Sequence, residues 1–128
     1  MSTELFFLTL SAGLCAIMWA PYVLARIKSW GLVNAVGYPD NPPAVPAWSQ
    51  RAQRAHANMV ENLVPFTALV LVAQAAGIST ETTALGATLF FWTRVVHTLA
   101  LILAIPWVRT LAFAASWVGM LLIFLALF

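Results

Sequence analysis

Runs of apolar residues long enough to cross a bilayer dominate this chain of 128 residues. The hydrocarbon core of a membrane is about 30 Å thick, and a helix of about 20 apolar residues spans it. Leu5–Ala25, Thr82–Ile105 and Val108–Phe128 meet this length, and Pro21 is expected to kink the first run near its end. Because backbone polar groups in lipid must bond within their own segment, these runs predict transmembrane α-helices.

A fourth span is expected from a segment that is only partly apolar. Leu63–Gly77 is too short to span alone, and becomes long enough only if Gln50–Asn62 continues the same helix. The connection Ser29–Ser49 is rich in Gly, Pro and Asn and predicts a long loop, and Pro106 predicts a tight break. We therefore expect an all-α membrane protein, a four-helix bundle forming a single domain over residues 1–128. Its helices are predicted at about residues 4–28, 50–77, 81–105 and 107–127.

Composition supports the membrane class and excludes several others. Hydrophobic residues make up 62% of the chain, against only six Lys or Arg and four Asp or Glu. Six basic residues leave no basic stripe to follow phosphates, so no nucleic-acid partner is expected. The one cysteine, Cys15, excludes an internal disulfide, and neither histidine has a second His or Cys at ligand spacing. No metal site is therefore expected.

The distribution of Lys and Arg predicts how the helices are oriented. Four basic residues flank the long first loop, and a fifth lies beside the third connection: Arg26, Lys28, Arg51, Arg54 and Arg109. The N-terminus and the turn between the second and third spans hold none. By the positive-inside rule, the long loop should face the cytoplasm and both termini the opposite side of a multi-pass membrane protein. In a bacterium this would be the inner membrane.

A polar cluster interrupts the second span. At 100° per residue, its ionisable and amide groups share a stripe about 100° wide, made of Arg51, Arg54, Asn58, Glu61 and Asn62 and continued by Pro65. His56 falls on the opposite side and is interpreted as an interfacial residue. Ionisable groups at membrane depth face a bundle interior or a wet cavity. The stripe is therefore either a ligand site or a polar lock, in which Arg54 and Glu61 pair with Arg94 or with neighbouring backbone.

The third span carries polar residues on a face of its own: Arg94, His97, Thr98 and Leu101 are spaced to share it. Glu61 cannot neutralise both Arg54 and Arg94. The surplus of positive charge favours an anionic ligand over a closed lock, although a lipid headgroup would also neutralise this charge. His97 could act as a general acid or base, but the simpler interpretation is a hydrogen-bonded packing residue.

The segment from Arg51 to Phe66, RAQRAHANMVENLVPF, closely resembles the helix-two motif of the MAPEG family, membrane-associated proteins in eicosanoid and glutathione metabolism. The stretch Arg94–Thr98, followed by Pro106 and Arg109, extends the resemblance over essentially the whole chain, which is similar to bacterial-type members related to microsomal glutathione transferases. The resemblance implies a homotrimer among membrane lipids, with glutathione as a cosubstrate bound between neighbouring subunits and open toward the cytoplasm. Glutathione carries two carboxylates and one ammonium group, which arginines and a carboxylate can bind.

The resemblance also implies roles for individual residues. Arg54, Asn58 and Glu61 match positions that contact glutathione, Arg26 and Arg94 match basic positions of the site, and His97 is a further candidate contact. Arg109 is similar to the arginine thought to stabilise the glutathione thiolate, since a cation beside a thiol lowers the pKa of that thiol. The implied reactions are conjugation of a lipophilic small-molecule electrophile entering from the bilayer, or peroxide reduction.

Two departures from the family pattern bear on activity. Leukotriene C4 and prostaglandin E synthases carry tyrosines at places that correspond here to Leu101 and Phe113, and Thr110 stands where a serine can stand. A lost tyrosine hydroxyl removes a ligand hydrogen bond, on the order of 1 kcal/mol or more in a buried site. The connection between the third and fourth spans, before Arg109, is also about one residue shorter than in the family pattern. These differences argue against eicosanoid synthesis and weaken the case for transferase activity without excluding it.

Two other interpretations stand beside the enzyme. One is a catalytically silent protein of the same fold, which binds glutathione or lipid without turnover. The other is a small four-helix multidrug transporter. Such transporters need a membrane-embedded carboxylate, usually on the first helix, and Leu5–Ala25 contains none.

Overall fold

The computed structural model describes residues 1–128 and is built from helices alone. In chain order these are α1 (Thr3–Ile17), α2 (Trp19–Trp30), α3 (Leu32–Val36), α4 (Ala47–Ala75), α5 (Glu81–Ile102) and α6 (Pro106–Ala126). Four stretches are long and apolar enough to cross a membrane, namely α1 with α2 as one run, α4, α5 and α6. The predicted all-α architecture with four candidate spans is confirmed.

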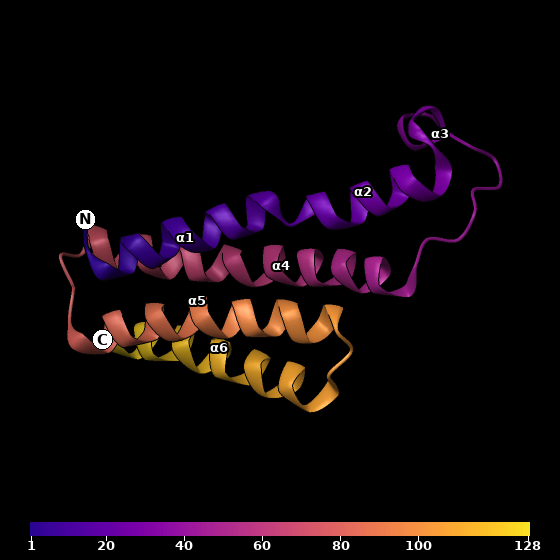
Figure 1. Cartoon of the computed structure of the whole chain (residues 1–128). Helices are drawn as coiled ribbons and strands as arrows, with labels where there is room; N and C mark the ends of the chain where they lie inside the picture. Colours follow the sequence, from indigo (N-terminus) through magenta and orange to yellow (C-terminus); the bar gives the residue numbers. More distant parts are fainter.

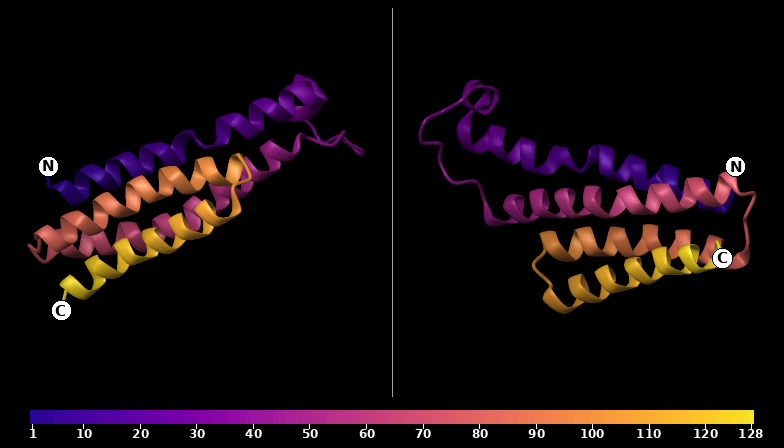
Figure 2. Two further views of the ribbon diagram at one scale, coloured as in Figure 1. Left: turned by 60° about the horizontal axis from the view of Figure 1, so that its bottom comes forward. Right: turned by 180° about the vertical axis from the view of Figure 1, so that it is seen from behind.

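The four spans lie side by side and alternate in direction (Figures 1 and 2). Both termini lie at one end of the bundle, and α3 and the long loop lie at the other. The hairpin of α5 and α6 is the most closely packed pair, and α5 also packs against α1 and α4. The termini and the long loop are thus on opposite sides of the bundle, while the side that faces the cytoplasm stays a prediction.

The first span is divided, whereas a single helix over about residues 4–28 was predicted. The break lies at Met18, nearer the middle of the run than the predicted kink. Pro21 causes it, because proline has no N–H to donate to the carbonyl of Ile17 and its ring clashes there. The Met18 N–H bonds instead to the Cys15 carbonyl at 3.3 Å.

The other boundaries differ in smaller ways. The helix that begins at Ala47 starts about one turn before its predicted start near residue 50, and the third span ends at Ile102, short of the predicted 105. Ala104 takes a left-handed conformation, with φ 60°, and the Ile105 N–H bonds to the Ala100 carbonyl at 2.8 Å. This is the Schellman arrangement that ends many helices. Within the long loop, α3 was not predicted.

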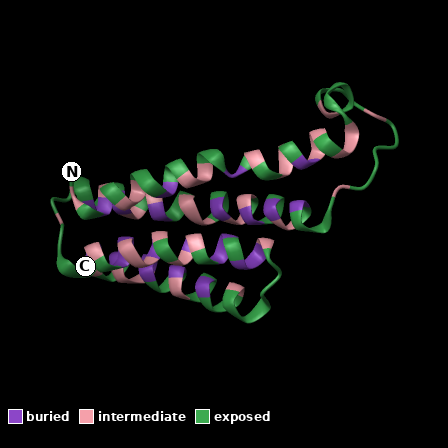
Figure 3. Ribbon diagram, viewed as in Figure 1, coloured by how far each residue is buried: buried purple, intermediate pink, exposed green.

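The core lies where α4, α5 and α6 meet, as the buried segments in Figure 3 show. The rings of Phe66 and Phe90 stack with centroids 3.8 Å apart. Gly86 and Gly119 allow the backbones of α5 and α6 to touch, since a Cβ on either would lie 2.6 Å from the carbonyl oxygen of the other. The two C-terminal helices therefore form a rigid hairpin against which α4 packs.

The first span contacts this core through a narrow seam. Its buried residues fall one in every seven: Glu4, Ser11, Met18 and Ala25. Glu4 accepts hydrogen bonds from Ser79 Oγ, at 3.1 Å to each carboxylate oxygen, and from Thr83 Oγ1. These bonds tie the start of α1 to the turn before α5, a contact that the sequence analysis did not predict.

Candidate functional site

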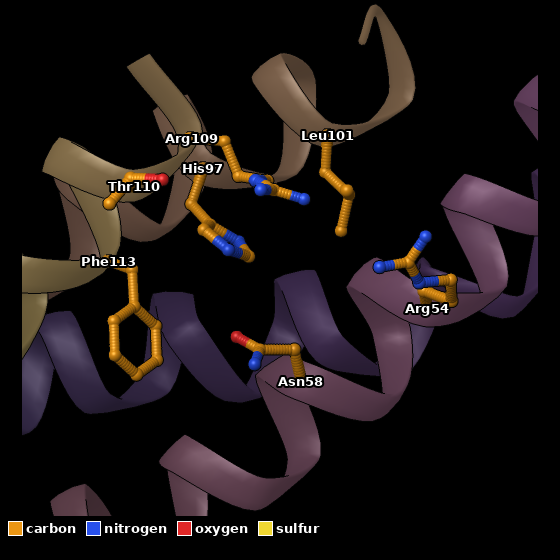
Figure 4. A pocket seen from close by; sticks show the side chains of 7 residues that line it. All are labelled: Arg54, Asn58, His97, Leu101, Arg109, Thr110 and Phe113. Atoms are coloured by element: carbon orange, nitrogen blue, oxygen red, sulfur yellow. The ribbon is translucent and has the colours of Figure 1, made fainter. Parts of the chain in front are cut away.

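An open cavity of about 270 Å³ lies between α4, α5 and α6, near the end of α5 and the start of α6. Figure 4 shows the side chains that line it. Its lining consists of Arg54 and Asn58 from α4, His97 and Leu101 from α5, and Arg109, Thr110 and Phe113 from α6. Each helix presents residues one turn apart, which is the spacing that places side chains on one helical face. The cavity thus collects one face from each of three spans.

A second cavity of about 210 Å³ adjoins the first and shares Arg54, Leu101 and Arg109 with it. It adds Arg51, whose Nε donates a 3.1 Å hydrogen bond to the carbonyl of Ile102 at the last residue of α5. Three arginines therefore line the two cavities, and no carboxylate does. Guanidinium groups gathered without a counter-charge favour an anionic ligand.

Arg94 lies beside Asn58 and is wholly buried, at 0% exposure. Its Nη2 donates to Asn58 Oδ1 at 2.6 Å, while Nε and Nη1 have no partner. The predicted polar lock had Arg54 and Glu61 pairing with Arg94 or with neighbouring backbone, whereas the hydrogen-bond partner of Arg94 is Asn58. A buried cation without a counter-charge is costly, so Arg94 adds to the positive charge beside the cavity without lining it.

The predicted face of α5 is confirmed, since Arg94, His97, Thr98 and Leu101 are all buried. His97 lies 6.2 Å from the ring of Phe113, measured between centroids. Its Nδ1 has no hydrogen-bond partner, and neither has the hydroxyl of Thr98. The ring of His97 forms part of the cavity wall, and whether His97 binds a ligand or only packs stays a prediction.

Two candidate residues lie apart from the cavity within a single chain. Glu61 is exposed in the middle of α4. Arg26 lies on α2, where its guanidinium stands 5.4 Å from the centroid of the Trp30 ring and lines a separate hollow. The structure thus brings Arg54, Asn58, His97 and Arg109 together, joins Arg94 to them through Asn58, and leaves Glu61 and Arg26 outside.

The residues that depart from the family pattern lie in the cavity, whereas His56 lies outside it. Leu101, Thr110 and Phe113 all line the cavity, and the Thr110 hydroxyl donates to the Pro106 carbonyl of its own helix at 3.1 Å. His56 does not line the cavity, and its Nδ1 lies 2.8 Å from the Tyr22 hydroxyl, joining α2 to α4. The helical spacing of 100° per residue placed His56 away from the polar stripe of the second span, but nothing in the sequence pattern predicted Tyr22 as its hydrogen-bond partner.

Comparison with known proteins gives one match. The model described as the MAPEG family matches residues 8–128, a range that includes every residue lining the cavity. No curated protein and no solved structure matches the chain significantly.

Proposed function

The chain belongs to the MAPEG family, and we propose that it is a glutathione-dependent membrane enzyme acting on lipophilic electrophiles or lipid peroxides. The observation that carries this proposal is the cavity lined by arginines without a carboxylate. Family membership supplies glutathione as the anionic molecule, and the cavity supplies a place with suitable charge. The proposal extends the family assignment to a particular ligand and reaction.

The residues of the cavity fit the polar groups of glutathione. Arg51 and Arg54 can bind carboxylates, because a guanidinium offers paired donors to two carboxylate oxygens. Asn58 Oδ1 accepts from Arg94, so the amide nitrogen of this lining residue is left free to donate to a ligand. The ammonium group needs an acceptor, and Glu61 is the nearest carboxylate in sequence to this face of α4.

Glu61 motivates the second part of the proposal, an assembly of three copies with the ligand between neighbours. A carboxylate exposed to lipid in the middle of a span is costly. A neighbouring copy or a ligand that covers α4 would remove Glu61 from lipid. The family resemblance implies that Arg26 belongs to the site, and because it lies away from the cavity of its own chain, we propose that a neighbouring copy supplies it. The proposed number of three copies comes from the family resemblance. The charges of Glu61 and Arg26, which lie outside the cavity of the single chain, support an assembly of several copies.

Arg109 is the proposed catalytic residue. It lies in the first turn of α6, where its N–H bonds to the carbonyl of Ile105 at 3.1 Å. The N-terminus of a helix carries partial positive charge, so the guanidinium and the helix end both favour a thiolate at this place. When bound, glutathione supplies the sulfur nucleophile. The chain's own residues would hold its carboxylates, stabilise the thiolate and give a lipid-soluble substrate access from the bilayer.

A silent binding protein is the second candidate, and one observation favours it. Leu101 and Phe113 line the cavity without hydroxyls, and the Thr110 hydroxyl donates to its own helix. A site with fewer donors binds the same ligand less tightly, since each lost bond costs on the order of 1 kcal/mol. Binding of glutathione without turnover would decide for this candidate.

The test uses the whole chain in lipid nanodiscs. Glutathione binding is measured by calorimetry, and turnover is measured with chlorodinitrobenzene and with a lipid hydroperoxide. We expect Arg109→Ala to lose most turnover while retaining part of the binding, and Arg109→Lys to retain more turnover. Val108→Ala, a change on the same turn at a residue outside the cavity, serves as the matched control. Full turnover in Arg109→Ala would refute the proposed thiolate mechanism.

A further inference from the structure

The elbow at the end of α2, defined as residues 28–38, carries apolar side chains that the chain leaves uncovered. Gly31 turns the chain with φ 81°, and α3 follows directly. The exposed fractions of Leu32, Val33, Val36 and Tyr38 are 64, 84, 74 and 100%. These four apolar residues, all exposed within seven positions, are called the apolar patch, and their exposure to water would be unfavourable.

The elbow is held against the rest of the chain. Leu32 and Val36 face Val23 and Ile27 across a hollow of about 180 Å³ between α3 and α2. Trp30 Nε1 donates a 2.6 Å hydrogen bond to the carbonyl of Pro43, which fixes the returning loop. The apolar patch is therefore presented on a structured element.

The direction and level of α3 suit a position in the headgroup layer. Figure 1 looks nearly along α3 but across α1 and α2, so α3 runs crosswise to the spans. The run Thr3–Trp30 has 28 residues, or about 42 Å at 1.5 Å per residue, against a hydrocarbon core of about 30 Å. Its excess length carries α3 past the ends of α5 and α6 (Figure 1). Trp48 and Trp107 are exposed, and each is the second residue of its helix, α4 or α6, so both lie at the ends of spans as aromatic belt residues do.

The charges at this end favour an anionic surface. Lys28 is exposed on the last turn of α2, and Arg26 lies two residues before it. Asp40 is the one acidic residue between α2 and the start of α4. A bilayer leaflet that contains anionic lipids attracts basic side chains at its surface. Apolar side chains beside exposed basic residues are the combination that interfacial segments use.

We propose that the elbow is an interfacial anchor, which lies in the headgroup layer of an anionic leaflet with Val33 among the upper acyl chains and Lys28 at the lipid phosphates. The anchor holds one end of the first span at a fixed depth and orients the loop that leads to α4. It depends on neither glutathione nor turnover.

The depth of the elbow can be measured with nitroxide labels, because Cys15 is the one native cysteine and can be replaced. In a Cys15→Ala background, Val33→Cys carries the label, and Asn41→Cys in the exposed loop is the matched control. Samples are vesicles of phosphatidylethanolamine with phosphatidylglycerol. We expect the ratio of oxygen to nickel-complex accessibility to be several-fold higher at position 33 than at position 41. Equal ratios would place the patch in water and overturn the proposal.

A second arm separates lipid from protein as the covering partner. If another copy of the chain or a different protein covered the patch, the label at position 33 would be inaccessible to both reagents, which would also overturn the proposal. Replacing phosphatidylglycerol by phosphatidylcholine should move the label outward, and Lys28→Gln should remove this dependence on lipid charge. If neither the exchange of lipid nor Lys28→Gln changed the depth of the label, the assigned role of Lys28 would be contradicted.

Discussion

Arg94 Nη2 donates a 2.6 Å hydrogen bond to Oδ1 of Asn58, and this bond joins α5 to α4 beside the arginine-lined cavity. Arginine has donors only, so the amide oxygen of Asn58 must face it and the amide nitrogen must face elsewhere. Asn62 adds a 2.8 Å bond to the backbone carbonyl of Asn58. A buried cation on one helix thus fixes the orientation of a cavity residue on another.

This relationship predicts opposite effects of two substitutions at Asn58. Asn58→Leu removes the single hydrogen-bond partner of buried Arg94 and should lower the free energy of unfolding by about 2–3 kcal/mol. Asn58→Asp keeps an acceptor and adds a counter-charge, so it should retain or raise stability while weakening the binding of an anion. Thermal unfolding in detergent and glutathione calorimetry check the pair. Equal melting temperatures for the two variants would contradict the assigned role of the bond.

The contact between α5 and α6 predicts intolerance to a single methyl group. Gly86→Ala or Gly119→Ala places a Cβ 2.6 Å from a backbone carbonyl oxygen, so the helices must separate. Overpacking of this kind typically costs about 1–3 kcal/mol. Gly13→Ala is the control, because no atom lies within 4 Å of the added Cβ, and it should be neutral or slightly stabilising. Equal effects of the three variants on thermal unfolding would contradict this packing.

The end of α5 predicts a stabilising substitution. Ala104 has φ 60°, a conformation that costs an L-residue roughly 1–2 kcal/mol and glycine very little. Ala104→Gly should therefore raise the melting temperature, even though glycine is more flexible in the unfolded chain. Gly77→Ala is the reciprocal test, since Gly77 has φ 69° and should resist a side chain. A lower melting temperature for Ala104→Gly would refute the assigned strain.

The four spans could be predicted because their apolar runs match the thickness of a bilayer and because Gln50–Asn62 is long enough to complete the second. The spacing of Arg94, His97 and Leu101 predicted one face of α5, which local helical geometry fixes without knowledge of neighbours. The family resemblance also pointed to Leu101 and Phe113, as places where related proteins carry tyrosines, and both residues line the cavity.

The remaining features depend on which helices touch. Asn58 as the partner of Arg94, and Glu4 as the acceptor for Ser79 and Thr83, join residues far apart in the chain and leave no local pattern. Helical spacing placed Glu61 on the same stripe as Arg54. It could not predict that, of these two residues, Arg54 lines a cavity of the single chain and Glu61 does not. Faces are local properties of a helix, whereas partners are properties of the whole bundle.

The central claim is that the arginine-lined cavity binds glutathione, and calorimetry on Arg54→Ala tests it most directly. Arg54 lines both cavities, and its exposed neighbour Gln53, which lines neither, gives the matched control Gln53→Ala. Loss of a charged hydrogen bond should weaken glutathione binding by about 1.5–3 kcal/mol, tenfold or more, in Arg54→Ala. Gln53→Ala should bind as the unmodified protein does. Equal affinity in all three proteins, or no binding by the unmodified protein, would contradict the account.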